Sequence, residues 1–315
     1  MLQVSYNRIN WRIRVDYIFS YHIISRKNDL SDNGFPTNDL EYSSQTIREM
    51  CDYLRDKSKS AAAIDKLDFL ESVVPSLDEL TEMVADIKNF YLEYFELNSN
   101  DETTIIKICF NLHHASRGRE HGDGCIDRIR LHLKNMVKST GIDDPVFFKY
   151  YFRYVLAHEM FHAFQCNHYL HLSPVKANSH SELFNKILME VLAEYFAYTY
   201  IRMFLKEKCN SDDSLYMERI LNTSDSNLYS NLHYFKPDRK ETLLKQSIEE
   251  INESVPEIQD YTGGYLMVLW NRKDKTGVIG RKWSWYKEIY ELMASDDTSE
   301  QGLDLAYSMY NKYFS

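Results

Sequence analysis

The segment "HEMFH" places His158, Glu159 and His162 in an otherwise apolar stretch of the chain. On a helix, two histidines four residues apart project from one face about a turn apart, near enough to bind one metal ion. Glu159 follows about 100° round the helix axis, where its carboxylate can reach a water molecule on that ion without being a ligand itself. Burying these groups beside Phe161 and Phe164 without partners would cost several kcal/mol, and a zinc ion removes most of that cost. The spacing therefore predicts a site for one Zn²⁺ ion per chain, with His158 and His162 as ligands.

A pair of glutamates, Glu190 and Glu194, lies in the apolar segment "MEVLAEYFA". Two like charges four residues apart on a helix repel each other by about 0.2–0.5 kcal/mol when solvated, and by more when buried. They therefore favour a cation or hydrogen-bond donors nearby. We expect Glu190 to be the third zinc ligand, which leaves one coordination position open, as in catalytic zinc sites. Glu194 would accept the N–H of a ligating histidine; in the alternative interpretation, both glutamates belong to a solvated acidic face.

The combination of HExxH on one helix and a glutamate on the next resembles the gluzincins, a group of zinc metallopeptidases. The resemblance covers residues 104–270. It implies hydrolysis of peptide bonds in a peptide or protein substrate by a zinc-activated water, with Glu159 as the general base. It also implies an edge strand that pairs with the extended substrate backbone, and we expect that strand in "CIDRIRLHLK".

The later segment "YTGGYLMVLW" matches the Y-x-x-G of gluzincin aminopeptidases through Tyr261 and Gly264. The resemblance implies that the Tyr261 hydroxyl stabilises the tetrahedral intermediate. A packing role is the alternative for Tyr261, because the chain contains 24 tyrosines, and His233 competes for the same catalytic role. The sequence lacks the G-x-M-E-N segment of those aminopeptidases, which weakens the case for an aminopeptidase.

A competing third ligand is His168, which follows His162 with the spacing of the metzincins in "HEMFHAFQCNH". Gln165 stands where that family has a glycine that turns the chain, and a left-handed backbone conformation is costly for Gln. A competing function is a catalytically inactive metallopeptidase-like protein with a structural or vestigial metal site. Glu159 argues against it, because a structural site has no need of a general base. A toxin-like protease exported without a signal peptide is a third possibility, which the sequence neither supports nor excludes.

The strands that would support the site are predicted from alternating apolar residues. "TTIIKICFNL" (103–112) and "CIDRIRLHLK" (125–134) each alternate, which predicts two strands, with "ASRGREHGDG" as a loop before the second. The second strand would be an edge strand. One of its faces would carry Ile129, Leu131 and Leu133, and the other would carry Arg128, Arg130 and His132.

Helices are predicted where apolar periodicity follows a cap. The helix over 76–96 opens with a capping box of Ser76 and Glu79, and the HExxH helix over 143–165 opens with an aspartate cap and Pro145. The glutamate pair lies on a helix over 179–208, which opens with a second capping box, Ser179 and Glu182. Further helices are predicted over 239–251, 261–271, 281–294 and 300–313.

A few strands followed by many helices predict an α+β fold, in which a short mixed or antiparallel sheet packs on the HExxH helix and a helix-rich C-terminal half follows. We expect residues 1–65 to be an N-terminal extension of unknown role and residues 66–315 to be a zinc metallopeptidase-like domain. Within that domain, 104–208 would hold the strands and the active-site helices, and 209–315 would be a helical part.

The composition is that of a globular protein, with 44% hydrophobic and 27% charged residues among 315. The net charge is −10 and the basic residues are scattered, which argues against a nucleic-acid partner. The five cysteines form no CxxC pair, which suits reduced thiols in a cytosol. The sequence has neither a conventional signal peptide nor a run of about 18 apolar residues, so we expect a cytoplasmic protein without membrane contact.

Overall fold

The computed structural model describes residues 15–24, 40–94, 102–112, 122–125, 128–168, 193, 196–205, 215–217 and 219–220. In chain order its elements are β1 (Val15–Ile24), β2 (Leu40–Glu41), α1 (Ser44–Lys57), α2 (Ala61–Val73), α3 (Leu77–Tyr94), β3 (Glu102–Asn111), β4 (Gly122–Cys125), β5 (Arg128–His132), α4 (Leu133–Thr140) and α5 (Pro145–His168). Residues 196–205 form a further helix, the 196–205 helix.

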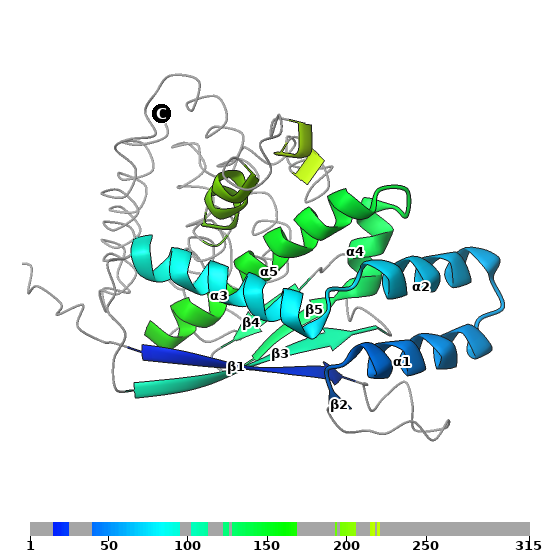
Figure 1. Ribbon diagram of the computed structural model, residues 1–315, viewed down its shortest axis with the longest axis horizontal. Coiled ribbons are helices and arrows are strands. Elements are labelled where there is room, and N and C mark those ends of the chain that lie inside the picture. Colours follow the sequence, from blue (N-terminus) through cyan, green and yellow to red (C-terminus); the bar gives the residue numbers. More distant parts are fainter. Residues whose placement is uncertain are drawn as a thin grey trace, which may run out of the picture.

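A five-stranded sheet in the order β2-β1-β3-β5-β4 forms one layer of the described fold (Figure 1). β1 pairs in parallel with β3 along the whole of both strands, and β3 pairs in parallel with β5. The two outer strands run antiparallel to their neighbours, β2 to β1 and β4 to β5. The prediction of an α+β fold with a short mixed sheet is therefore confirmed.

β3 is the central strand, and its side chains follow the predicted alternation. Ile106, Ile108 and Phe110 are at most 1% exposed on one face, whereas Ile105 on the other face is 59% exposed. Near the carboxyl end, Asn111 is buried on that second face as well. The beginning of β3 is therefore covered on one face and its end on both.

The second predicted strand, 125–134, is shorter in the structure and lies inside the sheet. β5 ends at His132 and Leu133 begins α4, so the alternating pattern does not continue as a strand. β4, which falls largely within the predicted loop, is the edge strand instead. The prediction of an edge strand over 125–134 was wrong, because the short, glycine-containing β4 carries no alternation by which a sequence pattern could detect it.

His132 corrects a second detail of that strand. It was predicted on a polar face with Arg128 and Arg130, yet it is 1% exposed, while both arginines are half-buried. Asn111 is its neighbour across the β3–β5 register, and its Nδ2 lies 3.5 Å from His132 Nδ1. A polar side chain is tolerated in a buried place where a neighbour offers a hydrogen bond.

Two helix starts follow the predicted caps. Before α3, the Ser76 N–H donates to the Glu79 carboxylate at 2.8 Å, and the Glu79 N–H donates to Ser76 Oγ at 3.2 Å. This is the reciprocal capping box. At α5, the Phe147 N–H donates to Asp144 Oδ1 at 2.9 Å, and Pro145 is the first helical residue. None of the described helices contains an apolar stretch long enough to cross a lipid bilayer.

The helix predicted over 179–208 is described only at Ala193 and over 196–205, and those residues are helical. Its capping residues Ser179 and Glu182 lie outside the described residues. The same holds for the helices predicted over 239–251, 261–271, 281–294 and 300–313.

Residues 1–65, which were expected to form an extension of unknown role, supply β1, β2 and α1. β1 is hydrogen-bonded to the central strand β3, and α1 packs against α2. On that helix pair, Arg55 of α1 forms ion pairs with Asp68 and Glu71 of α2. Asp65 itself lies within α2. The described part of this segment is thus built into the sheet and the helix layer.

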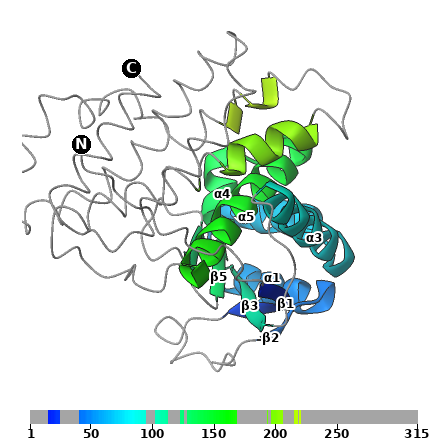
Figure 2. The same ribbon diagram turned by 90° about the vertical axis from the view of Figure 1, so that its left-hand side faces the viewer.

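The HExxH helix, α5, packs on the sheet. Figure 2 shows α3, α4 and α5 stacked over one side of the strands. Phe152 of α5 is stacked on Phe110 of β3 with ring centroids 6.2 Å apart, and Phe164 meets Tyr17 of β1 at 4.7 Å. Tyr91 of α3 stacks on Phe164 at 4.2 Å. These aromatic contacts fix α5 against strands on one side and a helix on the other.

Candidate metal centre

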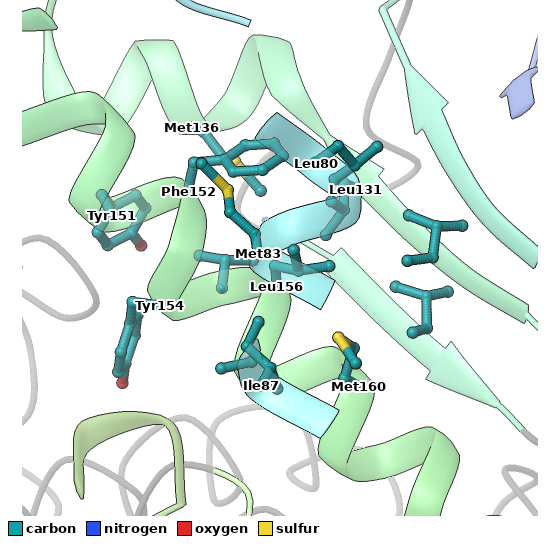
Figure 3. Close-up of a cluster of buried hydrophobic side chains, with 14 of the residues drawn as sticks. Leu80, Met83, Ile87, Leu131, Met136, Tyr151, Phe152, Tyr154, Leu156 and Met160 are labelled. Atoms are coloured by element: carbon teal, nitrogen blue, oxygen red, sulfur yellow. The ribbon is translucent and has the colours of Figure 1, made fainter. Parts of the chain in front are cut away.

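α5 presents two different sides. Leu156 and Met160 are fully buried and lie toward α3 and the strands (Figure 3). Tyr154, His158 and His162 follow one another at four-residue spacing, so they share the side of the helix away from Leu156. In Figure 3, Tyr154 lies on the opposite side of α5 from the strands. The apolar side of α5 therefore anchors the helix, and the side with the histidines carries the candidate chemistry.

The two imidazoles converge on one point. His158 Nε2 and His162 Nε2 are 3.0 Å apart, and the ring centroids are 4.7 Å apart with the rings inclined at 77°. Two histidine nitrogens on a tetrahedral zinc ion, each about 2.0–2.1 Å from the metal, would be separated by about 3.3 Å. The observed separation is a few tenths of an ångström shorter. The pair therefore fits two ligands of one zinc ion with only a small adjustment of the side chains.

The same 3.0 Å separation also suits a direct hydrogen bond, in which one ring donates its Nε2–H and the other accepts. The geometry of the pair thus permits either a shared metal ion or a shared proton.

Glu159 lies within the protein rather than on its surface. It is 6% exposed, and His162 is 7% exposed, whereas His158 is half-buried. A carboxylate in such a place is costly unless charge or hydrogen bonds stabilise it. Burial also removes most of the competing bulk water, which strengthens the electrostatic effect of any charge beside it.

The structure places some of the predicted site residues and does not describe others. His158, Glu159 and His162 lie together on α5 as predicted. His168 is the last residue of α5, and its side chain lies outside the part that the structure describes. Glu190, Glu194, His233 and Tyr261 lie outside the described residues.

Within the described ranges, no three side chains of the types His, Cys, Asp and Glu are grouped closely enough to hold a metal ion. Of the three expected ligands, those ranges include His158 and His162, and Glu190 lies outside them.

The 196–205 helix, which follows the glutamate pair in the sequence, packs directly beside the HExxH motif. Phe196 stacks on Phe161 with ring centroids 4.7 Å apart. At the other end of the contact, Phe204 meets Tyr150 at 6.5 Å. Later residues of one helix therefore meet earlier residues of the other, so the two helices run antiparallel.

A polar cluster joins α5, α3 and the 196–205 helix. Its member on α5 lies about one and a half turns before His158. The sequence patterns did not predict this cluster. Arg153 Nη1 of α5 donates to Asp86 Oδ2 of α3 at 2.7 Å and to the Tyr200 hydroxyl at 2.5 Å. The Tyr200 hydroxyl donates to the same Asp86 oxygen at 2.8 Å. Burial raises the pKa of the Tyr200 hydroxyl well above its usual value, so it remains a donor at neutral pH. The Arg153 guanidinium also lies 3.8 Å from the centroid of the Phe204 ring.

The sequence contains one signal for this cluster. Arg153 is a charged residue flanked by Phe152 and Tyr154 in the largely apolar first half of α5, and a charge on a buried part of a helix needs a partner. That signal gives no information about which residues of other helices supply the partner.

Comparisons of the chain with protein-family models, with curated proteins and with solved structures found no match. The class of protein is therefore defined by its residues and their geometry. It is an α+β chain in which a helix bearing H-E-x-x-H packs on a mixed sheet.

Proposed function

We propose that the protein is a zinc-dependent peptidase. The observation that carries the proposal is the convergence of His158 Nε2 and His162 Nε2 to 3.0 Å, with the buried carboxylate of Glu159 on the next residue of the helix. Two imidazoles at this separation, beside a potential base, supply the ligands and the proton acceptor that metal-assisted hydrolysis requires.

Glu190 is proposed as the third ligand, and the surroundings of the 196–205 helix support it. All six residues from Phe196 to Ile201 are at most 8% exposed, so the first part of this helix is buried around its circumference. Glu190 precedes Ala197 by seven residues, and an unbroken helix would bring the two onto one face. A carboxylate on a buried face needs a cation or several donors. The stack of Phe161 on Phe196 keeps this helix next to His162.

Bound zinc would lower the pKa of a water molecule toward 7 and polarise the substrate carbonyl. Glu159 accepts the proton of the attacking water and later returns it to the leaving amine. Glu194 accepts the N–H of a ligating histidine, which fixes the tautomer of that ring. The Tyr261 hydroxyl donates a hydrogen bond to the oxyanion of the tetrahedral intermediate.

A substrate in extended conformation is proposed to pair with β4. This strand is the outermost on its side of the described sheet, and it lies against α5. An edge strand carries backbone N–H and C=O groups on its outer side that pair with a peptide segment. β4 replaces the segment 125–134 as the proposed substrate strand, because β5 has neighbours on both sides.

The alternative function is a catalytically inactive protein that retains a structural or vestigial site. A hydrogen bond between the two imidazoles, which the 3.0 Å separation also suits, would satisfy one nitrogen of each ring without a metal. Such a protein would be purified without zinc and would not take it up.

Metal content is the measurement that tests the proposal. Mass spectrometry of the purified full chain should find one zinc per chain in the wild type and none in Glu190→Ala. His168→Ala is the matched control, and it should retain the metal. Loss of zinc in His168→Ala with retention in Glu190→Ala would identify His168, and not Glu190, as the third ligand. Absence of zinc from the wild type, even after zinc is supplied, would refute the proposed function and support the alternative.

A further inference from the structure

We infer that Asp86, Arg153 and Tyr200 are positioning residues for the metal centre, because they set the place of the 196–205 helix relative to α5. The inference rests on the proposed function, since it concerns α5, which carries His158 and His162, and the helix that follows the proposed ligand Glu190 in the sequence. It assigns a role to the polar cluster that the proposed chemistry does not use.

The cluster joins three separate elements through three mutually bonded atoms, one from each element. Asp86 Oδ2 accepts from both Arg153 and Tyr200, and Arg153 Nη1 donates to both partners. Tyr200 is 2% exposed and the Arg153 side chain is 11% exposed, whereas the Asp86 side chain is 44% exposed, so the bonds are shielded from water on the side of Arg153 and Tyr200. Hydrogen bonds to charged groups in such surroundings are directional and stronger than neutral ones. They therefore add a directional restraint on sliding and rotation of the 196–205 helix along α5 to the restraint that ring packing provides.

The cluster lies close to the candidate histidine ligands along α5. Arg153 precedes His158 by five residues, which is about 7.5 Å along a helix axis. In the sequence, Tyr200 follows the proposed ligand Glu190 by ten residues, and Phe196, which stacks on Phe161, lies between them. A shift of the helix at Tyr200 would therefore also move Phe196 against Phe161, the residue before His162.

A metal centre is sensitive to such a shift. The ligands of zinc lie within a few tenths of an ångström of a fixed distance. A helix free to slide by one ångström would hold its ligand less favourably, even if the fold remained intact. The cluster should therefore influence metal affinity and coordination geometry more than overall stability.

Tyr200→Phe is the most selective test variant. It removes the hydroxyl that bonds the 196–205 helix to α5 and α3, and it leaves the Arg153–Asp86 ion pair in place. It also keeps the ring that packs against Phe90 with centroids 5.3 Å apart. Asp86→Asn is a second variant, which removes the charge at the centre of the cluster.

The chain offers a matched control for these variants. Lys149 of α5 forms an ion pair with Glu79 of α3, with Lys149 Nζ 3.2 Å from Glu79 Oε1. This pair joins the same two helices as Arg153 and Asp86 do, but no described contact of the pair involves the 196–205 helix. Lys149→Met removes the ion pair and leaves the Glu79 capping bonds of α3 intact.

The experiment measures the zinc dissociation constant of the full-length wild type, Tyr200→Phe, Asp86→Asn and Lys149→Met by competition with a chromophoric chelator. The visible spectrum of each cobalt-loaded protein is recorded beside it, because cobalt absorption reports coordination geometry. Tyr200→Phe and Asp86→Asn should bind zinc about tenfold more weakly than the wild type, the lower end of the effect of losing an outer partner. Both should show an altered cobalt spectrum, while Lys149→Met should match the wild type in both measurements.

Two results would overturn the positioning role while leaving the proposed function in place. One is a zinc affinity of Tyr200→Phe and Asp86→Asn equal to that of the wild type. The other is an equal loss of zinc affinity in Lys149→Met, which would indicate that all these variants weaken zinc binding through a general loss of protein stability. A wild type that binds no zinc would instead refute the proposed function, and the positioning role with it.

Discussion

The rings of Phe161 and Phe196 stack with centroids 4.7 Å apart and planes inclined at 25°. Phe161 is the residue between Met160 and His162, and Phe196 comes two residues after Glu194. Both rings are fully buried. One aromatic contact thus brings the HExxH motif of α5 next to the helix that follows the glutamate pair.

Phe196→Ala tests how much this contact contributes to the free energy of unfolding. Removing a fully buried ring should lower the free energy of unfolding by about 3–5 kcal/mol, because transfer energy is lost and a cavity remains. Urea denaturation monitored by circular dichroism measures the change. Ile105→Ala is the control: its side chain is 59% exposed, and the change should stay within about 0.5 kcal/mol. Equal effects of the two substitutions would contradict the packing described for Phe196.

Glu159→Gln tests the general base. The amide is nearly isosteric with the carboxylate but cannot accept a proton at neutral pH, so peptide hydrolysis should fall by about 10²–10⁴-fold. Zinc content should remain at the wild-type level, because Glu159 is not a proposed ligand. Hydrolysis of an unfolded protein or a peptide library gives the rate, and mass spectrometry gives the metal. A variant as active as the wild type would exclude Glu159 from the proton transfer.

Removal of the metal should lower the stability of the native state. Zinc that binds the folded chain alone, at a free concentration of 100 times its dissociation constant, contributes about 2.7 kcal/mol. Addition of a chelator should therefore lower the melting temperature of the wild type. The same chelator should leave the melting temperature of Glu190→Ala unchanged, since that variant should hold no zinc. A chelator shift of equal size in both proteins would place the metal elsewhere.

The contribution of Asp144 to the stability of the fold depends on pH in the acid range. Burial acts to raise the pKa of the Asp144 carboxyl, but hydrogen bonds from the Phe147 N–H and from Arg219 outweigh it, so the pKa is lowered. A lowered pKa in the folded state means that the carboxylate stabilises the fold above about pH 4, its value in the unfolded chain. This contribution is lost as the pH falls through the folded pKa.

Asp144→Ala should therefore cost about 1 kcal/mol at pH 7, the usual value for loss of a helix cap. The difference in stability between Asp144→Ala and the wild type should shrink as the pH is lowered from 5 to 2. Denaturation at a series of pH values measures it. A difference that stays constant over this range would contradict the role of the ionised carboxylate.

Features that depend on near neighbours in the chain could be predicted from the sequence. The four-residue spacing of His158 and His162 predicted a converging pair, and the structure brings their Nε2 atoms to 3.0 Å. The cap of α5 by Asp144 and the capping box at Ser76 were also predicted correctly. These features follow from helical periodicity and from side chains that bond backbone groups three residues away. A short segment of sequence is therefore enough to predict them.

Contacts between distant segments could not be predicted in this way and are seen only in the folded chain. The pairing of β1 with β3, the place of β4 at the edge, and the burial of His132 beside Asn111 all depend on strand register. The cluster of Asp86, Arg153 and Tyr200 joins residues up to 114 positions apart. Alternation along one strand identifies its buried face but not its neighbour, and a buried charge does not identify its partner. Those choices depend on the packing of the whole chain, because hydrophobic burial is non-directional and only the assembled core selects one set of neighbours.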